Sequence, residues 1–262
     1  MMRALSTAAT GMIAQQYNVD TISNNIANVN TTGFQANLAK FQDLIYQNLR
    51  APGTPVGPSI VPVGQDVGLG AKVGSSEKLF TQGTLQETDN PLDVAIEGTG
   101  FFQVTLPDGT TAYTRDGSFK VDANGQIVTA DGYFLNPQIT IPATATQVQV
   151  GSDGTVTAQI PGQQLPQTLG QIQLVRFINP AGLAPQGQNL FLQSGASGAP
   201  TISQPGLNGA GTLQGGYLEQ SNVSVVTEMV NLITAQRAYE ANSKSVTTAD
   251  SMLQTAVQMK TA

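Results

Sequence analysis

Residues 24–35 read NNIANVNTTGFQ, and this amide-rich segment ends a regular helical pattern that starts near the N-terminus. The pattern consists of Leu5, Ala8, Met12, Gln15, Val19, Ile22, Ile26 and Val29. Its steps alternate between three and four residues, which is the a/d spacing of a coiled coil. The sequence therefore predicts a long N-terminal helix that stops at Asn30-Thr31-Thr32-Gly33, with Gly33 at a C′-like position.

The C-terminal segment carries a second stripe with the same alternating steps. It consists of Val225, Met229, Leu232, Gln236, Tyr239, Ser243, Val246, Asp250, Leu253 and Val257. We predict that the two terminal helices pair with each other and with neighbouring molecules; the plainer alternative is two amphipathic helices packed on one globular body. Polar residues interrupt both stripes and weaken them, so we expect the helices to be poorly ordered in the monomer and to order on assembly.

The bulk composition excludes several classes of protein. The 262 residues carry a net charge of −6, with a pI of about 4.5, so no basic surface is available to neutralise nucleic-acid phosphates. The chain has no Cys and no His, which removes disulfides, thiolate catalysis and the usual general base. We find no cleavable signal peptide and no run of 18 apolar residues, and therefore expect a cytoplasmic protein or one exported without such a signal.

Residues 46–75 form a segment rich in proline and glycine. Pro52, Pro55, Pro58 and Pro62 fall close together among several glycines. Neither a helix nor a central strand tolerates this density of proline. The segment is either a flexible linker or an extended arm that lies along a neighbour, and its several Val, Ile and Leu residues favour the arm.

The middle of the chain has the signature of short antiparallel strands. Turn dipeptides occur at Asp108-Gly109, Asp116-Gly117, Asn124-Gly125, Asp131-Gly132 and Asp153-Gly154. Such pairs favour type I′ hairpin turns, in which both central residues have positive φ. The predicted fold is therefore α+β, with terminal helices at 1–45 and 217–262, an arm at 46–75 and an antiparallel all-β domain at 76–216.

The motifs that suggest chemistry are weak. The segment GTGFFQ at 98–103 begins like a dinucleotide fingerprint, but position 103 is Gln and we expect a strand after it instead of a helix. Asp89, Asp93 and Glu97 are candidate paired acids of a glycosidase, although few aromatic residues remain to line a sugar cleft. We therefore predict no catalytic, cofactor or metal site.

Five long motifs resemble those of the bacterial flagellar rod and hook proteins. They occur in order between residues 22 and 254: ISNNIANVNTTGFQ at 22–35, DNPLDVAIEGTGFFQV at 89–104, AYTRDGSFKVDANGQIVT at 112–129, PGLNGAG at 205–211 and SNVSVVTEMVNLITAQRAYEANSKSVTTADSMLQ at 221–254. Chain length and the Pro/Gly-rich insert resemble the distal-rod members more than the proximal-rod or hook members. The resemblance implies a subunit that is exported by the flagellar type III apparatus and polymerises into a hollow helical drive shaft across the periplasm.

The resemblance also implies partners and contact residues. The partners are copies of the chain itself, proximal rod proteins, the hook or hook-junction protein, the P-ring and L-ring bushing, and the rod cap. We expect the amides of Asn24, Asn25, Asn28 and Asn30 to fix the position of the next subunit. The implied subunit interface on the inner helices consists of Leu5, Met12, Val19, Ile22, Asn24, Asn25, Ile26, Asn28, Val29, Val225, Met229, Leu232, Gln236, Tyr239, Val246, Leu253 and Val257.

Two other classes of function remain open on the sequence. A secreted β-domain that binds a surface or cell-wall ligand would be a monomer with ordered ends. A peptidoglycan hydrolase would lose turnover when Asp93 or Glu97 is changed.

Overall fold

The computed structural model describes residues 2–53, 55–56, 59–60, 62–163 and 165–261. The chain divides into two compact units. The first, which we call the helical unit, comprises Met1–Ala27, Asn37–Glu77 and Ser224–Ala262. The second, the β-rich unit, comprises Asn28–Ala36 and Lys78–Val223.

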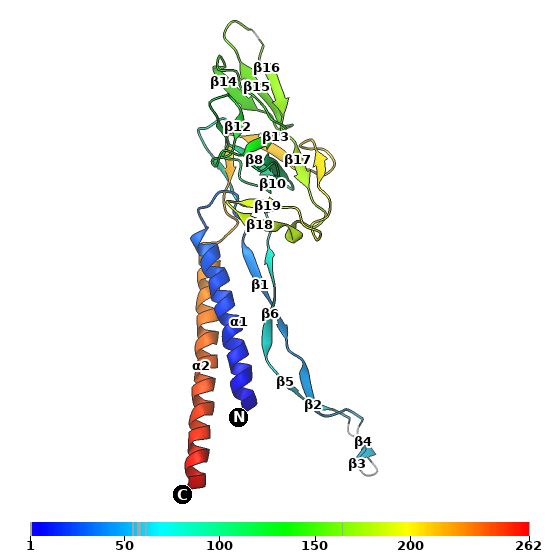
Figure 1. The fold of residues 1–262 in the computed structure, drawn as a ribbon, viewed down its shortest axis with the longest axis vertical. Coiled ribbons are helices and arrows are strands. Elements are labelled where there is room, and N and C mark those ends of the chain that lie inside the picture. The colour runs from blue at the N-terminus through cyan, green and yellow to red at the C-terminus, as the bar shows by residue number, and fades with distance from the viewer. Residues whose placement is uncertain (1, 54, 57–58, 61, 164, 262) are drawn as a thin grey trace. The chain divides into compact units, whose positions relative to one another are not determined.

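The helical unit contains two long helices and a long hairpin. Helices α1 (Met2–Ala27) and α2 (Val225–Thr261) pack side by side, and strand β1 (Asn37–Asp43) contacts α1 (Figure 1). In the hairpin β1 pairs with β6 (Ala71–Lys78), β2 (Tyr46–Arg50) with β5 (Gln65–Gly68), and β3 (Pro55–Val56) with β4 (Ser59–Ile60). The Pro/Gly-rich segment is thus the outer part of a two-stranded ribbon, where prolines interrupt no central strand.

The N-terminal helix is shorter than the pattern predicts. Helix α1 ends at Ala27, and the residues that follow turn back, with the Thr31 N–H donating to the Asn28 carbonyl. Gly33 has a φ of +67°, but it lies six residues beyond the last helical residue, so its assignment to the C′ position is wrong. The predicted boundary at residue 45 also differs from the structure, because β1 already begins at Asn37.

The β-rich unit is built on a nine-stranded antiparallel sheet in the order β11-β12-β13-β9-β10-β19-β18, with β17 pairing with both β9 and β20. Its strands are β9 (Phe101–Thr105), β10 (Thr111–Thr114), β11 (Lys120–Val121), β12 (Ile127–Val128), β13 (Phe134–Asn136), β17 (Leu174–Arg176), β18 (Ala184–Gly187), β19 (Leu190–Leu192) and β20 (Thr201–Ser203). A 3-10 turn, η1, spans Pro180–Gly182. The antiparallel β-domain predicted for the middle of the chain is confirmed.

Smaller sheets complete this unit. One has three strands, β14 (Gln147–Val150), β15 (Thr155–Gln159) and β16 (Gln167–Gln171). Two pairs join residues far apart in the chain: β8 (Val94–Glu97) with β21 (Thr212–Gly215), and β7 (Leu85–Glu87) with β22 (Tyr217–Glu219). These pairs bring the segment that leads into α2 against the start of the β-rich unit.

The apolar core lies in the β-rich unit. Its largest cluster includes Phe102, Phe119, Leu135 and Leu174, all at most 1% exposed. A second cluster is aromatic, and the rings of Phe101, Phe177 and Tyr113 meet edge to face in it. Burial of this kind is the main favourable contribution to folding, so this unit has the means to fold without a partner.

Four of the five predicted turn dipeptides do form turns, but of another type. The glycines at 109, 125, 132 and 154 have positive φ, whereas the Asp or Asn before each does not. In each turn the glycine N–H donates to the carbonyl three residues earlier, as in a type I turn with a G1 bulge. Positive φ at both central residues, as in a type I′ turn, occurs instead at Gln188-Asn189 between β18 and β19.

Candidate functional site

Most exposed large apolar side chains lie on the helical unit. On α1 and the hairpin they are Met2, Ile13, Tyr17, Leu38, Phe41, Ile45, Tyr46, Leu49 and Val63. On α2 they are Val225, Val226, Met229, Val230, Ile233, Tyr239, Met252, Val257 and Met259. The β-rich unit contributes Leu79, Val121, Leu165, Ile178, Ile202 and Leu207. Exposed apolar surface gathered on one part of a chain marks a site of protein association.

The same helices bury little. On α1 the buried residues are Ala8, Ala14, Ile22 and Asn25, and on α2 the buried apolar residues are Ala235 and Ala249. A pair of helices held by alanines, and a hairpin with two strands, are both marginal in water. The helical unit therefore has a large apolar surface and a small core.

The predicted α1 stripe faces inward in the structure. Ala8 and Ile22 are buried, and Leu5, Met12, Gln15, Val19, Ile26 and Val29 are half-buried. Gly11 lies where α1 meets α2, because a side chain there would come within 2.9 Å of Asn242 Nδ2. Small residues at this point let the two helix backbones approach closely.

The two series of the predicted α2 stripe differ in exposure. In the first, Leu232, Val246 and Leu253 are half-buried, whereas Val225 and Tyr239 are 36% and 41% exposed. In the other series Met229, Gln236, Asp250 and Val257 are exposed, and only Ser243 is half-buried. The inward positions are one residue earlier, at Glu228, Ala235, Asn242 and Ala249. At two of these four positions the inward residue is an alanine, smaller than the Gln236 or Asp250 that follows it.

Asn25 binds within its own chain. Its side chain is 2% exposed, its Nδ2 donates to the Asn37 carbonyl at 2.9 Å, and its Oδ1 accepts from the Asn37 N–H at 2.9 Å. Its Nδ2 also lies 3.3 Å from Glu228 Oε1 at the start of α2. Asn25 thus fastens the end of α1 to the base of the hairpin and to α2.

The other asparagines of the segment are more accessible. Asn24 is exposed, and its Oδ1 accepts from Asn37 Nδ2 at 3.4 Å. Asn28 is half-buried, and its Oδ1 accepts from the Thr31 hydroxyl at 3.2 Å. Among the prolines assigned to the arm, Pro52 and Pro62 are exposed, Pro55 begins β3, and Pro58 lies outside the described residues.

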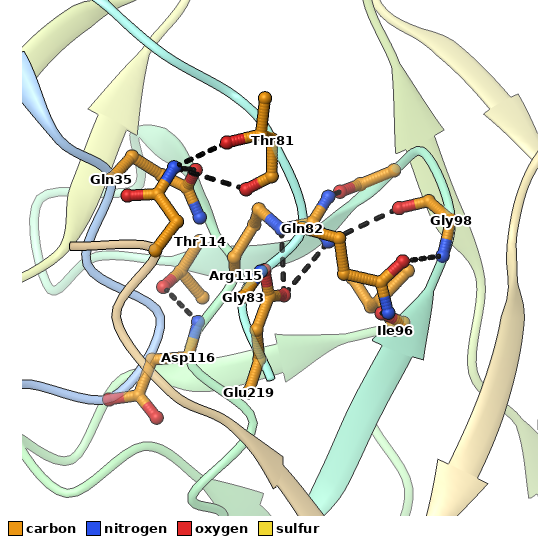
Figure 2. Close-up of polar contacts among 12 residues, drawn as sticks. Gln35, Thr81, Gln82, Gly83, Ile96, Gly98, Thr114, Arg115, Asp116 and Glu219 are labelled. Carbon is orange, nitrogen blue, oxygen red and sulfur yellow. Dashed lines mark hydrogen bonds and ion pairs between the residues drawn. The ribbon is translucent and has the colours of Figure 1, made fainter. Parts of the chain in front are cut away.

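A buried ion pair that the sequence did not predict lies in the β-rich unit. Arg115 Nε and Nη2 lie 2.9 and 2.8 Å from Glu219 Oε2, and the two side chains are 5% and 0% exposed. The remaining Arg115 donors reach the carbonyls of Gly98 and Gly100, and Glu219 Oε1 accepts from the Gly83 N–H. Figure 2 shows the Glu219 carboxylate between Arg115 and Gly83. Both charges are therefore compensated by polar contacts.

Two titratable groups of the β-rich unit have shifted pKa values. Burial raises the pKa of Asp116, and the neighbouring charges of Asp93 and Asp131 act in the same direction. Burial lowers the pKa of Lys78, whose Nζ lies 5.2 Å from the centre of the Phe34 ring. Neither group has the neighbours of an acid–base site, and both lie where chain segments pack together.

Two of the three candidate acids, Asp93 and Glu97, are engaged in structural contacts. Asp93 accepts hydrogen bonds from Thr88 and Asn90 side chains at 2.8 Å, and Glu97 accepts from Gln214 at 2.9 Å. Strand β9 follows GTGFFQ, as expected, and the Gly98 and Gly100 carbonyls face Arg115. Among the described residues no group of three His, Cys, Asp or Glu side chains is placed to hold a metal ion. In that same part of the chain, neither helix is both long and apolar enough to cross a membrane.

Three segments match known protein families. Residues 5–35 match the family described as flagella basal body rod protein, and residues 95–158 match the flagellar hook protein FlgE/F/G D1 domain. Residues 214–259 match the flagellar basal body rod FlgEFG protein C-terminal family. The first and last matches fall on the two helices, and the middle match falls on the β-rich unit.

Characterised relatives match over the full length. The chain is 52% identical to the flagellar basal-body rod protein FlgG of Caulobacter vibrioides, over 99% of this chain and 100% of that protein. It is 51% identical to FlgG of Borreliella burgdorferi, over 99% of each chain. It is 40% identical to FlgG of Bacillus subtilis, over 99% of this chain and 100% of that protein.

Proposed function

The chain belongs to the family of flagellar basal-body rod proteins, a structural family and not one of enzymes, and we propose that it is the subunit of the distal rod. In this proposal copies of the chain polymerise into a hollow helical shaft that encloses the export channel and transmits motor torque to the hook. The shaft spans the periplasm and turns inside the P-ring and L-ring bushing. The chain is 40–52% identical, over 99% of its length, to proteins named FlgG, and this similarity supports the distal rod over the proximal rod or hook.

The observation that carries this proposal is the contrast between the two units. The β-rich unit encloses its own apolar clusters, whereas the helical unit exposes most of the large apolar side chains and buries chiefly alanines. Neighbouring copies would cover that exposed surface, as they do in a polymer whose helices line its core. Subunits are exported through the type III apparatus without a cleaved signal peptide and contact the rod cap, the proximal rod and the hook or hook-junction protein.

We also propose that α1 and α2 form a coiled coil inside the shaft. Its inward positions on α2 are Glu228, Leu232, Ala235, Asn242, Val246, Ala249 and Leu253, and the partner stripe on α1 starts at Leu5 and ends at Ile26. The outward residues of the predicted interface, among them Met229, Tyr239 and Val257, then contact neighbouring subunits. Asn24 and Asn28 remain candidates for directional contacts of this kind. The hairpin serves as the arm that lies along an adjacent subunit.

Electron microscopy of the concentrated, purified chain tests this function. We expect uniform hollow tubes from the full chain and none from a chain lacking 2–27 and 225–261. The paired change Val226→Glu and Ile233→Glu places charge on two exposed α2 residues, at 74% and 57%, and is expected to abolish tubes. Leu165→Glu, at a residue 79% exposed on the β-rich unit, is the control and should assemble normally.

Two results would contradict the proposal. If the full chain stays monomeric at every concentration and in the presence of preformed rods, it is not a rod subunit, and a secreted β-rich binding module becomes the better account. If tubes form but restore motility only to cells lacking a proximal rod or hook subunit, the chain is another axial protein of the same family.

A further inference from the structure

The chain passes between its two units four times, after Ala27, Ala36, Glu77 and Val223. We call these four points the passages. A subunit that transmits torque between its helices and its β-sheet has to carry the force through them. The residues that hold the passages on the β-rich unit are therefore a functional part of the subunit. They lie in three segments of that unit: 28–36, 78–83 and 219–223.

One side chain, Asn222, holds three of the passages together. Its Oδ1 accepts from the Ala36 N–H at 2.8 Å, at the end of the first segment. Its Nδ2 lies 2.7 Å from the Leu79 carbonyl and 3.1 Å from the Thr81 carbonyl, in the second segment. Asn222 itself lies in the third segment, two residues before the helical unit resumes at Ser224. A side-chain amide can accept from backbone through its oxygen and donate to backbone through its NH2 group at the same time.

Glu219 connects the same three segments through other atoms. Its backbone carbonyl accepts from the Gly33 N–H at 2.8 Å, and its carboxylate accepts from the Gly83 N–H at 3.1 Å. The carboxylate is in turn held by Arg115, whose guanidinium is anchored on the carbonyls of Gly98 and Gly100. The passages are thus tied to the sheet by charged hydrogen bonds as well as to one another.

Close backbone packing accompanies these bonds. A side chain on Gly33 would come within 2.7 Å of the Asp116 nitrogen, and one on Gly83 would overlap the carbonyl oxygen of Gln220. The side chain of Gln82 bonds to the backbone at both ends of its amide: it donates to the Ile96 carbonyl and accepts from the Gly98 N–H. The second segment therefore has little freedom to slide against the third.

From these contacts we infer that the three segments form a rigid coupling within each subunit, complete before assembly, and that Asn222 is its positioning residue. The coupling fixes where the four passages leave the β-rich unit, so that force is transmitted without loosening the chain there. This inference deepens the proposed function and rests on it for the role of torque. The bonding arrangement itself rests only on contacts within the β-rich unit.

Hydrogen exchange on the dilute full-length chain tests the coupling directly. Asn222→Ala is expected to speed exchange at least tenfold at residues 33–37 and 78–83, while the amides of strand β9 keep their rates. Asn222→Asp retains the acceptor but loses the donor, so it should loosen 78–83 and leave the Ala36 amide protected. Asn179→Ala removes an exposed amide that bonds to the Ala196 carbonyl, and this control should change neither segment.

Motility then tests the role in torque. In a bacterium that lacks its own rod subunit and that the wild-type chain restores, Asn222→Ala is expected to give rods of normal length but slower rotation under load. Unchanged exchange in both Asn222 variants would overturn the coupling. Faster exchange with unchanged rotation would overturn its role in torque. If the wild-type chain fails to build rods at all, the proposed function fails, while the exchange result still decides the coupling.

Discussion

At the scale of single residues, the ion pair of Arg115 and Glu219 is the most consequential feature of the β-rich unit. Its two residues are 104 positions apart, and both side chains are almost fully buried. Removing one partner of such a pair leaves an uncompensated buried charge, which typically costs about 3–5 kcal/mol. The pair could not be predicted from the sequence, because nothing local in either segment indicates which distant charge will meet it.

Glu219→Gln is therefore expected to lower the free energy of unfolding of the β-rich unit by about 3–5 kcal/mol. Urea unfolding followed by circular dichroism at the β-sheet wavelength measures the change. The same substitution at the exposed Glu97 is the control and should cost less than about 1 kcal/mol. A similar small loss in both variants would show that Arg115 is stabilised by the Gly98 and Gly100 carbonyls alone.

Asp116 makes stability depend on pH in the opposite sense to most acids. Burial raises its pKa, so the folded chain keeps this proton at pH values where the unfolded chain has already released it. The stability contributed by the protonated form is present below the unfolded pKa and is lost as the pH rises through the raised value. At neutral pH the charged carboxylate is a cost to folding.

Asp116→Asn should therefore stabilise the protein at pH 7 and have little effect near pH 3, where the carboxyl is protonated in both states. The amide oxygen can still accept from the Ser118 N–H, which lies 3.0 Å from the Asp116 carboxylate. Thermal unfolding across this pH range checks the prediction. A variant that is less stable at pH 7 would mean that the carboxylate charge is needed by its neighbours.

At the scale of secondary-structure elements, the positions of the turns could be predicted from the sequence, but their types could not. Asp-Gly and Asn-Gly pairs mark where hairpins turn, because glycine adopts positive φ without cost. They do not specify which turn is used, because glycine supplies positive φ at the second central residue of a type I′ turn and also just after the central residues of a type I turn with a bulge. Gln188-Asn189 is neither an Asp-Gly nor an Asn-Gly pair, so its two positive φ values could not be predicted from the sequence.

The residues through which α1 and α2 contact each other, here called the seam, were also only partly predictable from the sequence. Periodicity predicted both helices and placed the α1 stripe on its inner face. On α2 two neighbouring heptad series were available, and hydrophobicity favoured the series with Met229 and Val257 over the one with Ala235 and Ala249. Only the packing partner decides between them: Gly11 on α1 has no side chain and leaves room for Asn242, which belongs to the series of Ala235 and Ala249.

Adjacent substitutions on α2 test this seam. Ala235→Glu places a charge at a position 3% exposed and is expected to separate the helices and prevent tube assembly. Gln236→Glu, one residue later on the exposed face, should leave the helix pair intact. Cross-linking between cysteines introduced at Gly11 and Asn242 reports the pairing in each background. If both substitutions abolish the cross-link, or if neither does, the seam assigned to α2 is contradicted.

At the scale of the whole molecule, burial is distributed unevenly between the two units. The apolar clusters lie within residues 94–213, and exposed apolar side chains gather on the helices and the hairpin. A chain built in this way can keep its β-rich unit folded while the apolar surface of the helices and the hairpin stays uncovered. The order of the elements was predictable from the sequence, but this imbalance follows from three-dimensional burial.

Limited proteolysis of dilute monomer and assembled tubes tests whether the helical unit orders on assembly. Cleavage requires local opening, and the helical unit has few buried contacts to oppose it. Trypsin is expected to cut the monomer first at Arg3, Lys40, Arg50, Lys72, Arg237 and Lys244, leaving a fragment that begins at Val73 and ends at Arg237. Arg115 is buried, and Arg176 bonds to the Asn208 carbonyl, so the β-rich unit should survive.

In the tubes the sites on the helices should become resistant, because neighbouring subunits cover them. A monomer whose helices resist trypsin as well as the β-rich unit does would mean that α1 and α2 are stable as an isolated pair. Assembly would then be controlled by the hairpin or by other surfaces. Early cleavage at Lys120 would instead show that the β-rich unit also depends on its neighbours, and that its buried clusters are insufficient to hold it together.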